Sequence, residues 1–208
     1  MKHLLSRVVC KNSDEKQKAL AELQNICNQC KACALCNTRT CTVFSDGKAD
    51  APIMLIGESP GPDEDAAGKP FVGRTGQLLN TFLAEAGLDR ENDFYICNTI
   101  KCKTPQSRVP TNEEKRACQP YLFGQISIVR PKIILLCGTT AMHTFVDEDL
   151  KLTDIRGKWL NIFDDIEVMA IFPPSYLLRQ HSTEPNTPRW FTKKDLEKVK
   201  ATLDDLTL

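Results

Sequence analysis

The chain has 208 residues, which is enough for one full-sized domain with a hydrophobic core and too few for two domains of average size. Hydrophobic residues make up 41% of it, no apolar run approaches the roughly 20 residues of a membrane-spanning helix, and a net charge of zero argues against nucleic-acid binding through overall charge. No signal-peptide cleavage site follows the opening residues, so we expect an intracellular, cytoplasmic protein whose ten cysteines bind a metal or cluster and do not form disulfides.

The first expected element is a helix over residues 13–28. Asn12 is followed three residues later by Glu15, as in a capping pair, and apolar residues then recur at helical spacing. This helix leads into a run of cysteines. We therefore assign residues 1–26 to an N-terminal extension and residues 27–208 to the main domain.

Four short apolar runs, bounded by glycine, proline or asparagine, predict buried strands. Segments with helical periodicity alternate with them, and one of these opens with a capping box formed by Thr111 and Glu114. The strands are expected at 52–57, 94–98, 132–138 and 166–172, and the helices at 78–87, 111–129, 139–146 and from about 188 to the end.

Alternating strands and helices predict parallel pairing with right-handed crossovers. The expected fold class is therefore α/β, a three-layer α/β/α sandwich around a roughly four-stranded parallel sheet. Ligands bind such sheets beyond the carboxyl ends of the strands. Four unusual segments fall there and predict one shared crevice: Gly57-Glu-Ser-Pro-Gly61, Asn98 with its loop, Gly138-Thr-Thr140 and Pro173-Pro-Ser-Tyr-Leu-Leu-Arg179.

The glycine-rich segment over residues 57–79 is too long and particular for a generic turn. It resembles the first motif of the type-four, iron-sulfur uracil-DNA glycosylases. The resemblance covers roughly residues 27–200, and it implies an enzyme of base excision repair that everts uracil from DNA and hydrolyses its glycosidic bond. Further motifs follow in the expected order: Asn98-Thr-Ile-Lys-Cys-Lys103, Cys118-Gln-Pro-Tyr-Leu122, Arg156-Gly-Lys-Trp159 and Pro174-Ser-Tyr-Leu-Leu-Arg179.

Two residues have the chemistry to hold a uracil ring. The resemblance places Phe71 under the everted base, where a ring stacks; a core phenylalanine is the alternative. Asn98 presents a donor and an acceptor that match O4 and N3 of uracil, whereas cytosine shows the opposite order. An asparagine that caps the turn after a strand is the competing interpretation of Asn98.

Acidic residues of the first motif are candidates for catalysis. The resemblance puts Glu58 and Ser59 near the sugar and the attacking water, and either Glu58 or Asp65 could stabilise positive charge on the sugar. The same resemblance implies that Glu64 crowds the C5 edge and rejects the methyl group of thymine. Carboxylates in such a loop are often simply solvated.

Uracil-containing DNA is the implied partner, together with replication or repair proteins, and we expect a monomer. The resemblance assigns Leu178 as a wedge between bases and Arg179 as a phosphate contact. Lys101 and Lys103 belong to a locally basic segment expected beside the DNA. A buried Leu178 and a solvated basic loop are the alternatives.

The cysteine spacing admits several ligand sets, including those of zinc or of a ferredoxin-like cluster. In the family pattern, Leu and Arg lie two and six residues after the second cysteine, as Leu35 and Arg39 do after Cys33. The implied cofactor is a structural 4Fe-4S cluster. Its implied ligands are Cys30, Cys33, Cys102 and Cys118.

One position departs from the family. The third motif begins with a histidine that donates to uracil O2, and here that position is Pro173, which has no donor. Ser175, its backbone amide or His181 are candidate replacements. Two functions therefore remain open. One is a working uracil-DNA glycosylase, including one that is slower or altered in substrate. The other is a non-catalytic relative that binds uracil-containing DNA or a replication partner.

Overall fold

Six strands form a single sheet in the computed structural model, which describes residues 10–207. Their order is β1-β3-β2-β4-β6-β5, and the four central strands are parallel, which confirms the predicted fold class. The edge strands are antiparallel, and each has two residues, too few to show a periodic pattern. The strands are β1 (Asp46–Gly47), β2 (Ile53–Gly57), β3 (Phe94–Asn98), β4 (Ile133–Cys137), β5 (Trp159–Leu160) and β6 (Glu167–Ile171).

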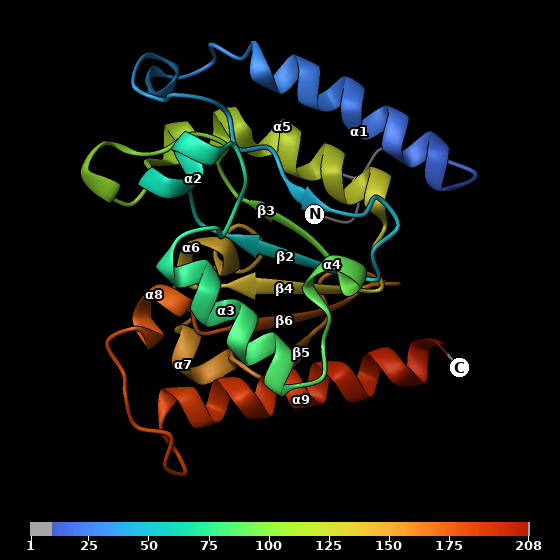
Figure 1. The fold of residues 1–208 in the computed structure, drawn as a ribbon, viewed down its shortest axis with the longest axis vertical. Coiled ribbons are helices and arrows are strands. Elements are labelled where there is room, and N and C mark those ends of the chain that lie inside the picture. Colours follow the sequence, from blue (N-terminus) through green and yellow to red (C-terminus); the bar gives the residue numbers. More distant parts are fainter. Residues whose placement is uncertain (1–9, 208) are drawn as a thin grey trace.

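Helices cover both faces of the sheet because the order in which strands are added to the sheet changes direction after β3. It runs from β2 to β3 through one set of helices and then returns past β2 to β4, and right-handed crossovers place the two connections on opposite faces. In Figure 1, α1 lies beside α5, while α9 lies beside α3. The helices are α1 (Ser13–Asn28), α2 (Pro62–Ala67), α3 (Arg74–Glu85), α4 (Arg90–Asp93), α5 (Asn112–Val129), α6 (Thr139–Met142), α7 (Leu152–Ile155), α8 (Pro174–Leu177) and α9 (Pro188–Thr207).

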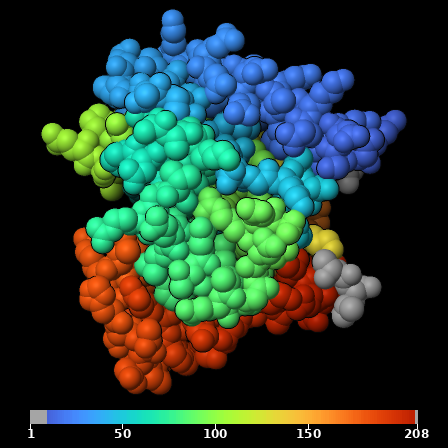
Figure 2. Space-filling view, in the orientation of Figure 1, coloured from blue at the N-terminus to red at the C-terminus, as the bar shows by residue number. Residues whose placement is uncertain are grey.

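The core is built on the central strands. Every residue of β2, β3 and β4 is buried, as expected for apolar runs covered by helices on both faces. Figure 2 shows one such covered face, with α2 to α4 between the N-terminal segments above and the C-terminal segments below. Both predicted helix starts are present: the Asn12 side chain accepts from the Glu15 amide, and Thr111 and Glu114 form a reciprocal capping box.

Helix α1 makes up most of the predicted N-terminal extension over residues 1–26, of which residues 1–9 lie outside the described part of the chain. It packs against α5, and its Leu20 and Cys27 are part of the main hydrophobic core. Among residues 10–207, no helix is both long and apolar enough to cross a lipid bilayer.

The Arg156 motif has a structural role. The Arg156 Nε donates to Asp195 Oδ2 on α9 over 2.8 Å, and its guanidinium lies 4.5 Å from the centre of the Phe191 ring. Gly157 leaves room for this pair, since a Cβ there would lie 2.2 Å from Asp195 Oδ1. The motif therefore fastens the last helix to the segment before β5.

Candidate active site

A cavity of about 310 Å³ opens at the carboxyl ends of β2, β3 and β4. Its volume is at the small end of the range for ligand pockets, which suits a single base. The loops after these strands line it, together with α3 and the start of α8. Six predicted site residues are among its lining side chains: Glu58, Ser59, Glu64, Phe71, Asn98 and Ser175.

Gly57 determines how the ring of Phe71 and the amide of Asn98 meet. Gly57 pairs with Asn98 at the ends of β2 and β3. A Cβ on Gly57 would lie 2.4 Å from Asn98 Oδ1 and 2.7 Å from Phe71 Cζ, closer than real contacts allow. Because glycine has no side chain, the ring and the amide both reach the same strand end. An aromatic face and an amide edge therefore share one cavity.

The comparisons with known proteins agree with this geometry. A family model described as the uracil DNA glycosylase superfamily matches residues 44–203. A type-4 uracil-DNA glycosylase of Thermotoga maritima is 43% identical over 174 residues, which cover 83% of this chain and 88% of the relative. The chain belongs to the type-4 uracil-DNA glycosylases.

Other similar relatives bear the same name. That of Pyrobaculum aerophilum is 38% identical over 168 residues, covering 77% of this chain and 85% of the relative. That of Archaeoglobus fulgidus is 40% identical over 156 residues, covering 72% of this chain and 78% of the relative. The predicted family is thus confirmed over most of the chain.

Asn98 lies at the end of β3 with its side chain available. It is 2% exposed as a residue, and it is among the residues that line the cavity. Its backbone carbonyl accepts a hydrogen bond from Lys101 Nζ over 2.7 Å. An amide at a strand end that lines a cavity is suited to bind a polar ligand in this type-4 glycosylase.

Glu58 is held in place by residues from two other strand ends. Thr140 at the start of α6 donates its hydroxyl proton to the Glu58 carboxylate, and the Thr99 hydroxyl donates to the Glu58 carbonyl over 2.6 Å. The sequence pointed to the Gly138-Thr-Thr140 segment as part of the crevice but did not predict that Thr140 contacts Glu58. Thr140 therefore orients the Glu58 carboxylate. Glu64 also lines the cavity, but its carboxylate is bound by three backbone amides.

Glu64 stabilises the loop that carries Phe71. Its carboxylate accepts from the amides of Gly61, Val72 and Gly73 over 2.9–3.0 Å. These charge-assisted bonds connect the start of α2 to the residues that follow Phe71. Glu64 also lines the cavity, and its role against thymine stays a prediction.

Asp65 does not line the cavity, so the prediction that it takes part in catalysis is wrong. Its carboxylate is 1% exposed, accepts from the Thr40 amide over 3.0 Å and forms an ion pair of 3.1 Å with Lys103. Burial raises the pKa of Asp65, but the bonds to Thr40 and Lys103 outweigh burial and leave the pKa below its ordinary value. Asp65 fastens the N-terminal segment to α2.

Lys101 is also placed otherwise than predicted. The prediction that it contacts DNA is wrong, because the side chain is 0% exposed and its ammonium donates to Asn98 O and to Gln125 Oε1 over 2.7 and 2.6 Å. It stabilises the turn after β3 from inside. Lys103 is partly exposed and paired with Asp65, and its contact with DNA stays a prediction.

The third motif contributes Pro173, Pro174 and Ser175 to the cavity, whereas His181 is exposed and lies outside the lining. Leu178 is half-buried at the end of α8, and Arg179 is exposed beside it, both also outside the cavity. Sequence reasoning missed three further lining residues, Thr75, Ser107 and Cys137. Cys137 belongs to the apolar run over 132–138 that predicts a buried strand, and its place as the last residue of β4 was the available signal.

The four predicted cluster ligands lie in one region. Cys33, Cys102 and Cys118 pack with Leu35 and Ile100 in a small cluster separate from the main core, and Cys30 is close enough to interact electrostatically with Cys33 and Cys102. Arg39, whose spacing from Cys33 matches the family pattern, donates to Cys102 Sγ over 3.2 Å and to the Cys30 carbonyl over 2.8 Å. All ten cysteines are free thiols.

The four cysteines have to meet the demands of the implied cofactor. Within residues 10–207, no three His, Cys, Asp or Glu side chains are grouped so that they could hold a metal ion. A four-iron cluster makes a different demand, because each of its four thiolates binds a separate iron. Four thiols from two distant segments, with the Arg39 guanidinium and the Lys101 backbone amide as hydrogen-bond donors to two of them, have the chemistry of that donor set. Burial raises the pKa of Cys118 to about 11, so cluster binding has to supply the energy of its deprotonation.

Proposed function

We propose that this protein excises uracil from DNA by hydrolysing the N-glycosidic bond of an everted nucleotide. The observation that carries the proposal is the absence of a side chain at Gly57, which lets the Phe71 ring and the Asn98 amide meet in one cavity. Membership of the type-4 uracil-DNA glycosylases agrees with it. Enzymes that act on a base need a stacking surface and an edge reader, and both are supplied here.

In this mechanism the uracil ring stacks on Phe71 and its edge pairs with Asn98. The amide accepts from N3 and donates to O4, so cytosine, which offers the reverse order, is disfavoured. Glu64 lies beside Phe71 and rejects a substituent at C5. The base is thereby selected before any bond breaks.

Hydrolysis breaks the bond between C1′ and N1, and the electron pair leaves with uracil. Positive charge develops on the sugar, where the Glu58 carboxylate, oriented by Thr140, stabilises it. Water adds to C1′ and loses one proton, and the uracil anion is protonated after departure. Ser59 and Ser175 line the cavity as hydroxyl donors for the water and the departing base.

Leu178 and Arg179 support eversion of the base. Both follow α8 directly, and the start of that helix lines the cavity. Leu178 enters the space that the base leaves, and the exposed Arg179 neutralises a phosphate. Lys103 adds a positive charge on the loop after β3.

A structural 4Fe-4S cluster held by Cys30, Cys33, Cys102 and Cys118 completes the proposal. When bound, it cross-links the N-terminal segment to the loop after β3 and takes no part in the hydrolysis. The protein's own residues, Arg39 above all, hold the two cysteine segments against each other.

The decisive experiment measures uracil release from single- and double-stranded oligonucleotides by the natural protein and by a Pro173→His variant. We expect release by both, and a rate about 10²- to 10³-fold higher in the variant, because histidine restores one donor to the departing oxygen. Pro173 lines the cavity and has a φ of −73°, which histidine also adopts.

The same assay separates the two functions that the sequence leaves open. If neither protein releases uracil while both bind uracil-containing DNA, the chain is a binding relative and the enzymatic proposal fails. Thermal unfolding of both proteins serves as the folding control.

A further inference from the structure

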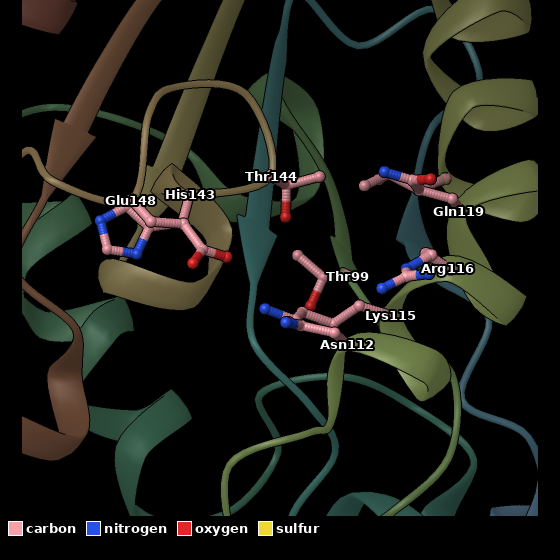
Figure 3. A pocket seen from close by; sticks show the side chains of 9 residues that line it. Thr99, Asn112, Lys115, Arg116, Gln119, His143, Thr144 and Glu148 are labelled. Atoms are coloured by element: carbon pink, nitrogen blue, oxygen red, sulfur yellow. The ribbon is translucent and has the colours of Figure 1, made fainter.

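A second cavity, of about 230 Å³, lies between α5 and the segment that follows α6. Figure 3 shows side chains of α5 on one side of it and His143, Thr144 and Glu148 on the other. Its volume is below the roughly 300 Å³ at which pockets for drug-sized ligands begin. The cavity suits a small polar group.

The side chains of α5 that face this cavity form a regular polar row. Asn112, Lys115, Arg116 and Gln119 are spaced at i, i+3, i+4 and i+7, which places them on one face of the helix. A polar row on a helix usually faces bulk solvent. Here it lines a cavity together with two threonines, Thr99 and Thr144.

The row carries two positive charges, on Lys115 and Arg116. Neither Lys115 nor Arg116 forms an ion pair or a side-chain hydrogen bond within residues 10–207. Their neighbour Arg108, by contrast, is paired with Glu114 over 2.6 Å. Glu148 is the one carboxylate in the lining, against two cations, so the cavity favours an anion.

This cavity is adjacent along the chain to the 310 Å³ cavity of the candidate active site, called the uracil cavity from here on. Asn98 lines one and Thr99, the next residue, lines the other. Across from them, the Thr144 hydroxyl donates to the Thr140 carbonyl over 3.0 Å, and Thr140 in turn donates to Glu58. Both cavities thus open near the carboxyl ends of β3 and β4.

We propose that this second cavity, the α5 cavity, binds a backbone phosphate of the DNA strand whose base enters the uracil cavity. The inference rests on the proposed function, because that function places a polyanion at this edge of the sheet. Lysine and arginine supply the charge, and the amides and hydroxyls of the row supply further donors to phosphate oxygens. The contact positions the strand and carries no sequence information.

The test measures binding of an oligonucleotide that contains 2′-fluoro-deoxyuridine, which is not cleaved, over a range of salt concentrations. Lys115→Ala/Arg116→Ala is expected to weaken binding about tenfold, the scale of a charge-assisted hydrogen bond. The negative slope of log K against log[salt] should become shallower by about 0.7–0.9, the value for one phosphate contact. Lys115→Arg/Arg116→Lys keeps both charges and should keep the slope.

The matched control is Lys48→Ala/Lys132→Ala. Both lysines are exposed and precede β2 and β4. The control therefore removes the same charge at the amino ends of the strands, whereas the α5 cavity lies near the carboxyl ends. If the slopes of the two alanine pairs fall equally, overall charge explains the effect and the proposal is overturned. It is also overturned if inorganic phosphate saturates the α5 cavity by NMR without weakening oligonucleotide binding, since a free anion is then the ligand.

Failure of this inference is distinguishable from failure of the proposed function, because the readout is binding and not excision. A protein that releases no uracil but shows the expected loss of slope keeps the phosphate site and loses the enzymatic proposal. If the protein releases uracil but the slope of the alanine pair is unchanged, the enzymatic proposal stands and the phosphate site is overturned.

Discussion

At the scale of single residues, the candidate site depends on a backbone conformation that glycine neighbours make possible. Phe71 has a φ of 53°, a left-handed conformation that costs a bulky residue about 1–3 kcal/mol. Arg90 donates to its carbonyl over 3.0 Å, and a Cβ on Gly76 would lie 1.8 Å from the same oxygen. The ring is therefore fixed by its surroundings before any ligand arrives.

Asn98→Ala tests the reading of the base. We expect uracil excision to fall about 10²- to 10³-fold and the preference for uracil over cytosine to disappear, because the one amide that distinguishes the two edges is removed. Excision rates on matched oligonucleotides with either base measure this. Asn25→Ala, an exposed change on α1, is the control. Unchanged discrimination against cytosine removes Asn98 from the site.

At the scale of elements, α5 joins several parts of the molecule. Its start carries the polar row of the α5 cavity, Cys118 faces the cysteine region, and Gln125 binds Lys101 under the turn after β3. The helix begins at a capping box in which Glu114 also accepts two bonds from Arg108. These bonds fix the loop before α5 to the helix.

Glu114→Gln tests this start through the pH dependence of stability. Hydrogen bonds from Arg108 lower the pKa of Glu114 from 4.5 to about 2. A lowered folded-state pKa stabilises the protein above the unfolded value, and this stabilisation is lost as the pH falls from about 4.5 towards 2. Urea unfolding should therefore show a gap in free energy between natural protein and variant that is constant above about pH 5 and narrows below it. Glu113→Gln, an exposed neighbour, should show no such gap.

At the scale of the whole molecule, the N-terminal segment is held by contacts with parts of the chain far away in sequence. Asp65 connects Thr40 to Lys103, and Arg39 connects Cys30 to Cys102. The site loop after β3 is thus fixed by residues that do not line the uracil cavity. The proposed cluster adds a covalent link at the same place.

Cys102→Ala tests the cluster. The purified natural protein should be brown and contain about four irons per chain, whereas the variant should be pale and melt about 10 °C lower, which corresponds to roughly 3–5 kcal/mol in a domain of this size. Absorbance, metal analysis and thermal unfolding measure this. Cys36→Ala, a change at a half-buried cysteine outside the proposed ligand set, should keep the colour. A colourless natural protein with stoichiometric zinc contradicts the assignment.

The sequence by itself determined the central sheet, the helix starts and the family. Continuous apolar runs specify buried parallel strands, and capping residues act on amides three residues away, so both can be predicted locally. The motif resemblance then brought Glu58, Phe71 and Asn98 to one crevice, where the structure places all three.

Only the tertiary structure decided which way the side chains of the loops turn. Lys101 and Asp65 lie in site motifs, yet each turns into the protein to satisfy a partner far away in sequence, Gln125 for the first and Thr40 for the second. The contact of Thr140 with Glu58 and the cavity shared by α5 and Thr144 likewise join residues from separate elements. Charge and polarity are properties of a residue, whereas burial and partner depend on what packs against it, and packing is fixed only when the whole chain has folded.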